Sequence, residues 1–156
     1  MNNNPFIAVG LAVVLVAPAF TQAAPSLMPF NVAVIGGVAA IPVPLTAKPG
    51  DPKEGENVVA ERRLGNCLSC HEIDALRREE FHGDIGPSLD GVARRWDTGT
   101  LRMIVVNAKK VFGDETVMPA FYRVDGLNRV RPEFLGKPIL TAQQVEDVVA
   151  FLATLK

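Results

Sequence analysis

The segment Cys67-Leu68-Ser69-Cys70-His71 carries the strongest chemical signal in this sequence. Two cysteines three positions apart lie on one side of a helical turn, and the residue after them points in another direction. The pattern C-x-x-C-H is typical of covalent c-type haem attachment, in which each thiol adds to a haem vinyl group and the histidine is the proximal iron ligand. We therefore predict that Cys67 and Cys70 hold one haem c covalently and that His71 coordinates its iron.

Three other roles of these residues are less consistent with the sequence than haem attachment. A zinc site needs four ligands, and only His82 is left to join the two cysteines and the histidine of the motif. A thioredoxin-like redox pair would need a βαβ setting, which the sequence does not indicate. A plain disulfide between Cys67 and Cys70 is the remaining alternative.

The segment that begins Gly86-Pro87 is placed to support the histidine. A metal-bound histidine normally donates its other ring N–H to a carbonyl or carboxylate group. We predict that the carbonyl of Pro87, on a stiff turn after Gly86, accepts the N–H of His71, and that Leu89 packs on the haem edge. An ordinary Gly-Pro turn beside a core leucine is the alternative.

His82, Met103 and Met118 are the candidates for the second axial ligand of the iron. Met103 falls inside a predicted helix, where most methionines fill the core. Met118 precedes Pro119, which favours an extended backbone and keeps Met118 off a helix. We expect Met118 to be the ligand, with His82 or an open iron site as the alternatives. Ligation by His and Met leaves no position for a substrate and indicates electron transfer, whereas an open site would indicate a sensor.

Helical periodicity dominates the segments that must position these residues. The predicted helices cover residues 54–63, residues 100–112, and the C-terminal segment that starts at Thr141, where Gln144 completes a capping box. No stretch beyond residue 50 alternates like a strand, so we expect an all-α domain. Its loops, at residues 72–99 and 113–140, are long enough to wrap a ligand or to carry function.

Charge divides the 156 residues into two parts, because all 33 charged residues, 16 basic and 17 acidic, lie at or beyond Lys48. The net charge of −1 excludes the strongly basic surface of a nucleic-acid binder. Two cysteines are too few for a disulfide scaffold. The charged part can form one small domain, of a size that a metal or cofactor often stabilises.

Residues 1–24 are predicted to be a secretory signal peptide. The apolar run Phe6–Phe20 has 15 residues, too few for a comfortable transmembrane helix, and small residues follow it. Cleavage would fall after Ala23 or Ala24. No Lys or Arg precedes the apolar run, so a retained membrane anchor is the alternative. We expect export to the periplasm, with no membrane span after cleavage.

Residues 25–50 are apolar and carry no charge before Lys48. Their length would suffice to span a bilayer, but several prolines and the Gly36-Gly37 pair interrupt any helix. We expect an extended apolar arm or linker ahead of a domain at residues 51–156. The alternatives are a poorly ordered segment or a later cleavage site.

Three segments in order resemble the SoxX family, the small monohaem cytochromes c of the SoxAX complexes of bacterial sulfur oxidation. The first motif alone fits any cytochrome c, and the second and third narrow the resemblance. It covers about residues 51–156. The segments are GNCLSCH at 65–71, GDIGPSLDGV at 83–92 and VMPAFYRV at 117–124, followed by GKPILT at 136–141.

The resemblance implies a class I cytochrome c fold of three to five helices around one haem, with the first and last helices crossing at Gly55. It also implies His71 and Met118 as axial ligands. The implied partner is a larger SoxA-like cytochrome with one or two haems, on which thiosulfate is coupled oxidatively to a cysteine of the carrier SoxYZ. This chain would be the electron-transfer subunit of that L-cysteine S-thiosulfotransferase complex and would pass electrons to a downstream acceptor cytochrome. A generic periplasmic cytochrome c for another reductase or oxidase is the alternative.

Overall fold

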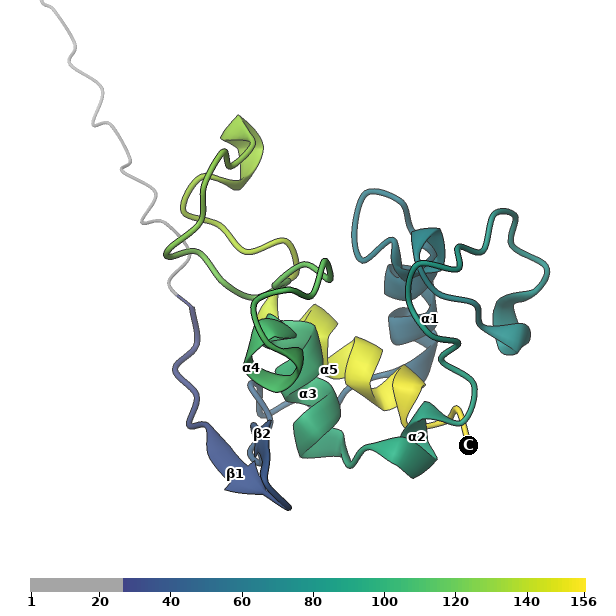
Figure 1. Ribbon diagram of the computed structural model, residues 1–156, viewed down its shortest axis with the longest axis horizontal. Coiled ribbons are helices and arrows are strands. Elements are labelled where there is room, and N and C mark those ends of the chain that lie inside the picture. Colours follow the sequence, from purple (N-terminus) through teal and green to yellow (C-terminus); the bar gives the residue numbers. More distant parts are fainter. Residues whose placement is uncertain (1–26) are drawn as a thin grey trace, which may run out of the picture.

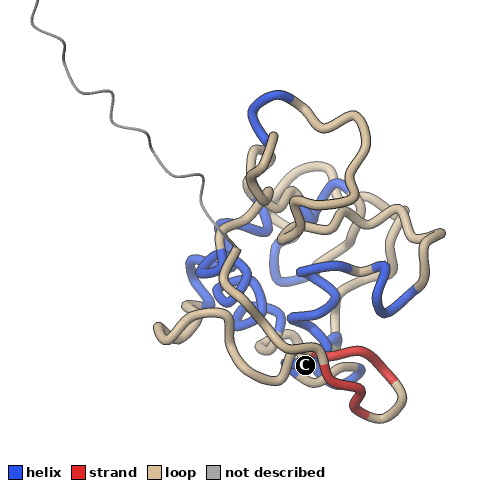
Figure 2. The backbone as a smooth tube through the Cα atoms, turned by 90° about the vertical axis from the view of Figure 1, so that its left-hand side faces the viewer, coloured by secondary structure: helices blue, strands red, loops and turns tan. Residues whose placement is uncertain are grey.

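The computed structural model describes residues 27–156, so the predicted signal peptide at residues 1–24 lies outside the described residues. The only strands of the described part form one antiparallel hairpin, and the rest consists of helices and long loops (Figure 2). No helix within residues 27–156 has the length and apolar character needed to span a membrane. The elements in chain order are β1 (Ala33–Ile35), β2 (Val38–Ala40), α1 (Pro52–Ala60), η1 (Cys67–Ser69), η2 (Asp74–Leu76), α2 (Val92–Arg95), α3 (Thr98–Asn107), α4 (Lys109–Phe112), η3 (Pro132–Phe134) and α5 (Ala142–Leu152).

Helices α1 and α5 pack against each other in the middle of the fold (Figure 1). Gly55 of α1 lies at their contact, where a Cβ atom would be 2.8 Å from Cβ of Phe151 and closer still to the backbone carbonyl of Asp147. A glycine therefore lets the two backbones approach. Asp51 extends the contact, because its side chain caps α1 and its N–H donates to the carboxylate of Asp147 at 2.9 Å.

The other predicted helices are present with changed bounds. Helix α5 has the predicted capping box of Thr141 and Gln144. The helix predicted over residues 100–112 is divided into α3 and α4, because the N–H groups of Val111 and Phe112 both donate to the carbonyl of Ala108 and so begin a new turn. Every residue of α3 from Gly99 onward is buried, so this helix has no solvent-exposed face in its main part.

Residues 27–50 run along the domain, with the β1–β2 hairpin beside α3 (Figure 1). Ile41 is fully buried, and its N–H donates to the carbonyl of Gly99 at 3.0 Å. At the start of the arm, the N–H of Met28 donates to the hydroxyl of Tyr122 at 2.8 Å. The surface that this apolar arm covers therefore belongs to its own domain.

A buried ion pair ties the arm to α3 and α5. Nε of Arg102 lies 2.7 Å from Oε1 of Glu146, and the two side chains are only 6% and 5% exposed. A second bond, of 2.9 Å, joins Nη2 to Oε2. Each partner also reaches the arm, since Arg102 donates to the carbonyl of Ile41 at 2.7 Å and Glu146 accepts the N–H of Leu45 at 2.8 Å. The ion pair therefore joins α3 to α5, and its bonds to the backbone of Ile41 and Leu45 include the arm in the same buried network.

Replacing Arg102 by Met should lower the free energy of unfolding by about 3–5 kcal/mol, because Glu146 would stay buried without its cation. The double variant R102M/E146L should recover a large part of this loss, since apolar side chains can replace a buried ion pair at little cost. Urea unfolding followed by circular dichroism measures both values. A double variant as unstable as R102M would show that the bonds to the arm, and not the ion pair, provide the stability.

Candidate haem-binding site

The C-x-x-C-H motif begins on the 3₁₀ turn η1, and Cys70 and His71 directly follow this turn. The chain reaches this turn from α1 through Gly65 and through Asn66, whose φ of 49° is in the left-handed region. The N–H groups of Cys70 and His71 both donate to the carbonyl of Cys67, at 3.1 and 2.9 Å. The backbone of this turn therefore fixes the two thiols and the imidazole relative to one another.

Cys67 and Cys70 are not joined by a disulfide, so both sulfur atoms remain for the cofactor. Burial raises the pKa of the Cys67 thiol to about 12, with a small further rise from Cys70, against the opposing effect of a backbone hydrogen bond. A thiol with a raised pKa is a poor source of the thiolate that a zinc site needs. Within residues 27–156, no three His, Cys, Asp or Glu side chains are grouped so that they could hold a metal ion.

The imidazole of His71 contacts both the carbonyl of Pro87 and the backbone of Gly86. Its Nδ1 is 2.7 Å from the carbonyl oxygen of Pro87, so the hydrogen bond expected from the sequence is present. The ring N–H donates in this bond, which leaves Nε2 free for a metal. Gly86 lies against the ring, where a Cβ atom would be 2.6 Å from Nδ1, 2.8 Å from Nε2 and closer still to Cε1. The N–H of Gly86 donates to the carbonyl of Cys70 at 2.8 Å, which closes this group of contacts.

Arg95 supports the turn that presents the Pro87 carbonyl. Its Nη1 and Nη2 donate to the carbonyls of Asp90 and Ser88, both at 2.7 Å. This role could not be predicted from the sequence, because Arg95 belongs to one of several arginine pairs in the chain and nothing in the local pattern distinguishes it.

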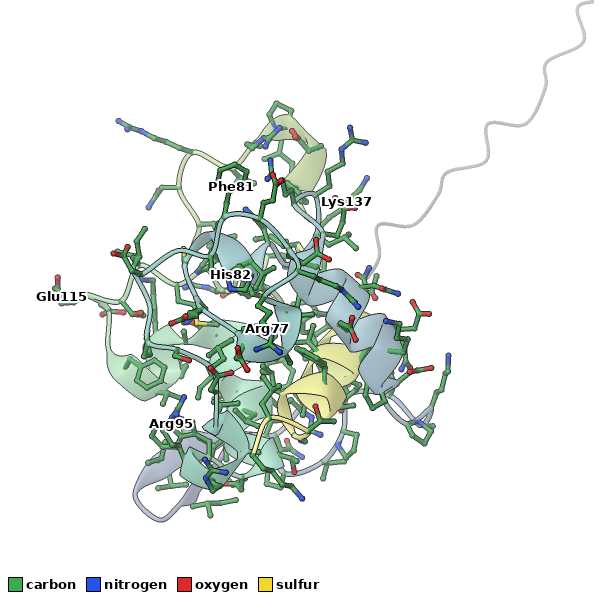
Figure 3. The ribbon with its side chains drawn as sticks, turned by 90° about the vertical axis from the view of Figure 1, so that its right-hand side faces the viewer. Arg77, Phe81, His82, Arg95, Glu115 and Lys137 are labelled. Atoms are coloured by element: carbon green, nitrogen blue, oxygen red, sulfur yellow. The ribbon has the colours of Figure 1, made fainter. Side chains whose placement is uncertain are left out.

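His82 has both ring nitrogens bonded to the backbone of its own loop. Nδ1 accepts the N–H of Ile73 at 3.3 Å, and Nε2 lies 3.1 Å from the carbonyl of Leu76. The side chain lies within the loop, whereas the neighbouring Phe81 is 75% exposed (Figure 3). These contacts disfavour His82 as an iron ligand and give it a structural role in the long loop after the motif.

The two candidate methionines lie in different environments. Met103 is 1% exposed and belongs to the core, as expected for a helical methionine. Met118 is half-buried and packs on the edge of the core from the loop after α4. The chain beyond it is fixed to α3, since the N–H of Phe121 donates to the carbonyl of Val105 at 3.2 Å. Met118 is therefore held by a different part of the fold from the group around His71.

Comparison with known proteins agrees with this arrangement. The Cytochrome c family matches residues 52–156. A chain in the crystal structure of SoxXA from P. pantotrophus matches with 50% identity and a TM-score of 0.72, over 80% of this chain and 94% of that chain. No curated protein matches the chain.

The cofactor is a covalently attached haem c, as predicted from the motif. The described residues fit this group. Two cysteines that are not joined by a disulfide lie on one turn, and the adjacent imidazole has Nδ1 bonded to a carbonyl, which leaves Nε2 for the iron. In the same region, Leu68 is buried and Leu89 packs on the core, which provides apolar surroundings.

Replacing Gly86 by Ala should displace the imidazole of His71, because the added methyl group would overlap the ring. We expect the holoprotein to be destabilised by about 1–3 kcal/mol and to show an altered visible spectrum. The control is Asp84→Ala, which changes an exposed residue of the same loop. If G86A kept the spectrum of the wild type, or if D84A changed it equally, the proximity of Gly86 to the ring would be irrelevant to haem ligation.

Proposed function

This chain belongs to the cytochrome c family and is of the SoxX type, and we propose that it is the exported electron-transfer subunit of a SoxAX-like complex. In such a complex, thiosulfate is coupled oxidatively to a cysteine of a SoxYZ-like carrier. The 50% identity to a chain of the SoxXA structure, over 94% of that chain, is the observation that carries this proposal.

We assign the covalent haem attachment to Cys67 and Cys70 and the axial positions to His71 and Met118. When bound, haem c with His and Met ligands accepts and releases one electron at a raised reduction potential. The Pro87 carbonyl fixes the orientation of the His71 ring and makes the imidazole a stronger donor. Two axial ligands from the protein leave no position for a substrate, which supports electron transfer over substrate chemistry on this chain.

The proposal therefore places the substrate chemistry on a partner. We infer a SoxA-like cytochrome subunit with one or two haems as that partner, and a downstream cytochrome as the electron acceptor. Export to the periplasm through a signal peptide at residues 1–24 is part of the same proposal. It is supported by the uncharged apolar run at the start of the chain.

Met118→Ala should abolish the methionine-to-iron charge-transfer band of the oxidised protein and lower its reduction potential, because a thioether ligand favours the ferrous state. Met103→Leu changes a methionine of the core, and His82→Ala changes the other considered ligand, so both should keep the band. Visible absorption and a potentiometric titration measure these effects. A wild-type spectrum without the band, or its loss in H82A alone, would contradict the assignment of Met118.

The partner assignment predicts that the native protein co-purifies with a larger cytochrome. Deleting the gene should also abolish thiosulfate oxidation by the cells. Complementation with the wild-type gene should restore it, whereas C67S/C70S should not, because the thioether bonds need both thiols. If the cells oxidise thiosulfate without this chain, a generic periplasmic cytochrome c becomes the better assignment.

A further inference from the structure

A lysine side chain holds the turn that leads into Met118. Lys109 is the first residue of α4, and its Nζ lies 2.9 Å from the carbonyl oxygen of Asp114 and 2.7 Å from that of Thr116. Both acceptors belong to the backbone of the turn immediately before Met118. The ammonium group is thus bonded to two points of this turn at once.

Further hydrogen bonds connect this turn to Met118 itself. The N–H of Gly113 donates to the carbonyl of Lys109 at 3.0 Å, and the N–H of Thr116 donates to the carbonyl of Gly113 at 3.3 Å. Gly113 has a φ of 85°, a conformation that glycine adopts without strain. The N–H of Met118 then donates to Oγ1 of Thr116 at 3.4 Å. A continuous path of hydrogen bonds therefore runs from the end of α4 to the methionine.

The charge of the ammonium group strengthens its bonds to this turn. Hydrogen bonds from a cationic donor are about twice as strong as those between neutral groups. A hollow of about 590 Å³ lies beside the lysine, and Asp114 and Lys110 also line it. A side chain without the ammonium group would therefore leave the two carbonyls of the turn to water, and the turn would lose this link to α4.

We propose that Lys109 is a positioning residue for Met118. Its ammonium group fixes the turn at residues 113–116 and thereby keeps the methionine sulfur in place as an axial ligand. This inference rests on the proposed axial role of Met118. Without the two bonds of Lys109, the loop moves more freely, and an external ligand such as imidazole displaces the methionine from the iron at lower concentration.

The test compares Lys109→Met with Lys110→Met in the oxidised holoprotein. Both variants remove one lysine and keep an unbranched side chain. Lys110 is exposed, whereas the ammonium group of Lys109 bonds to the turn. Imidazole titration, followed by the loss of the methionine-to-iron band, measures how firmly the methionine is held. We expect K109M to bind imidazole on the order of tenfold more tightly than the wild type, and K110M to match the wild type.

Equal imidazole affinities of K109M, K110M and the wild type would overturn the inference. Equal increases in both variants would also overturn it, because they would reflect the loss of surface charge. If K109M folds incompletely by circular dichroism, Lys109→Gln provides the same comparison, since it retains an amide donor but loses the charge. A wild type without the methionine-to-iron band would instead refute the axial role of Met118, so the two failures are distinguishable.

Discussion

The close contact of α1 with α5 is the constraint on which the rest of the structure depends. It exists because Gly55 presents no side chain to the backbone of α5. Only a few residues separate the end of α1 from the motif turn, and the N–H of Gly65 donates back to the carbonyl of Val58 in α1 at 3.1 Å. The helix contact therefore determines where the two thiols and the imidazole of His71 lie.

Helix α5 also organises the opposite part of the fold. Glu146 of α5 binds Arg102 of α3 in a buried, bidentate ion pair, and both residues bond to the backbone of the arm. Helix α3 in turn holds the segment that follows Met118. One helix thus connects the part that carries the covalent attachment with the part that carries the proposed methionine ligand.

The loops around the site are fixed by cationic side chains that bond to backbone carbonyls. Arg95 binds two carbonyls of the turn that contains Pro87, and Lys109 binds two carbonyls of the turn before Met118. Loops without regular secondary structure leave carbonyl groups without partners, and a guanidinium or ammonium group can satisfy two of them at once. Both candidate axial ligands are therefore supported by the same kind of interaction.

The sequence by itself determined the features that depend on neighbours along the chain. The spacing of Cys67, Cys70 and His71 specified the cofactor, the Gly-Pro dipeptide placed the carbonyl of Pro87, and Thr141 with Gln144 marked the start of α5. Each of these signals is local, because one turn of backbone decides the geometry.

Only the tertiary structure decided which distant segments meet. The uncharged composition of residues 27–47 fits a linker as well as a packed arm, and only contacts such as that of Ile41 with Gly99 distinguish the two. In the same way, the sequence could not distinguish Arg102, Arg95 or Lys109 from exposed basic residues. Their partners, such as Glu146 at 44 positions from Arg102, are brought to them by packing, and no local pattern encodes that meeting.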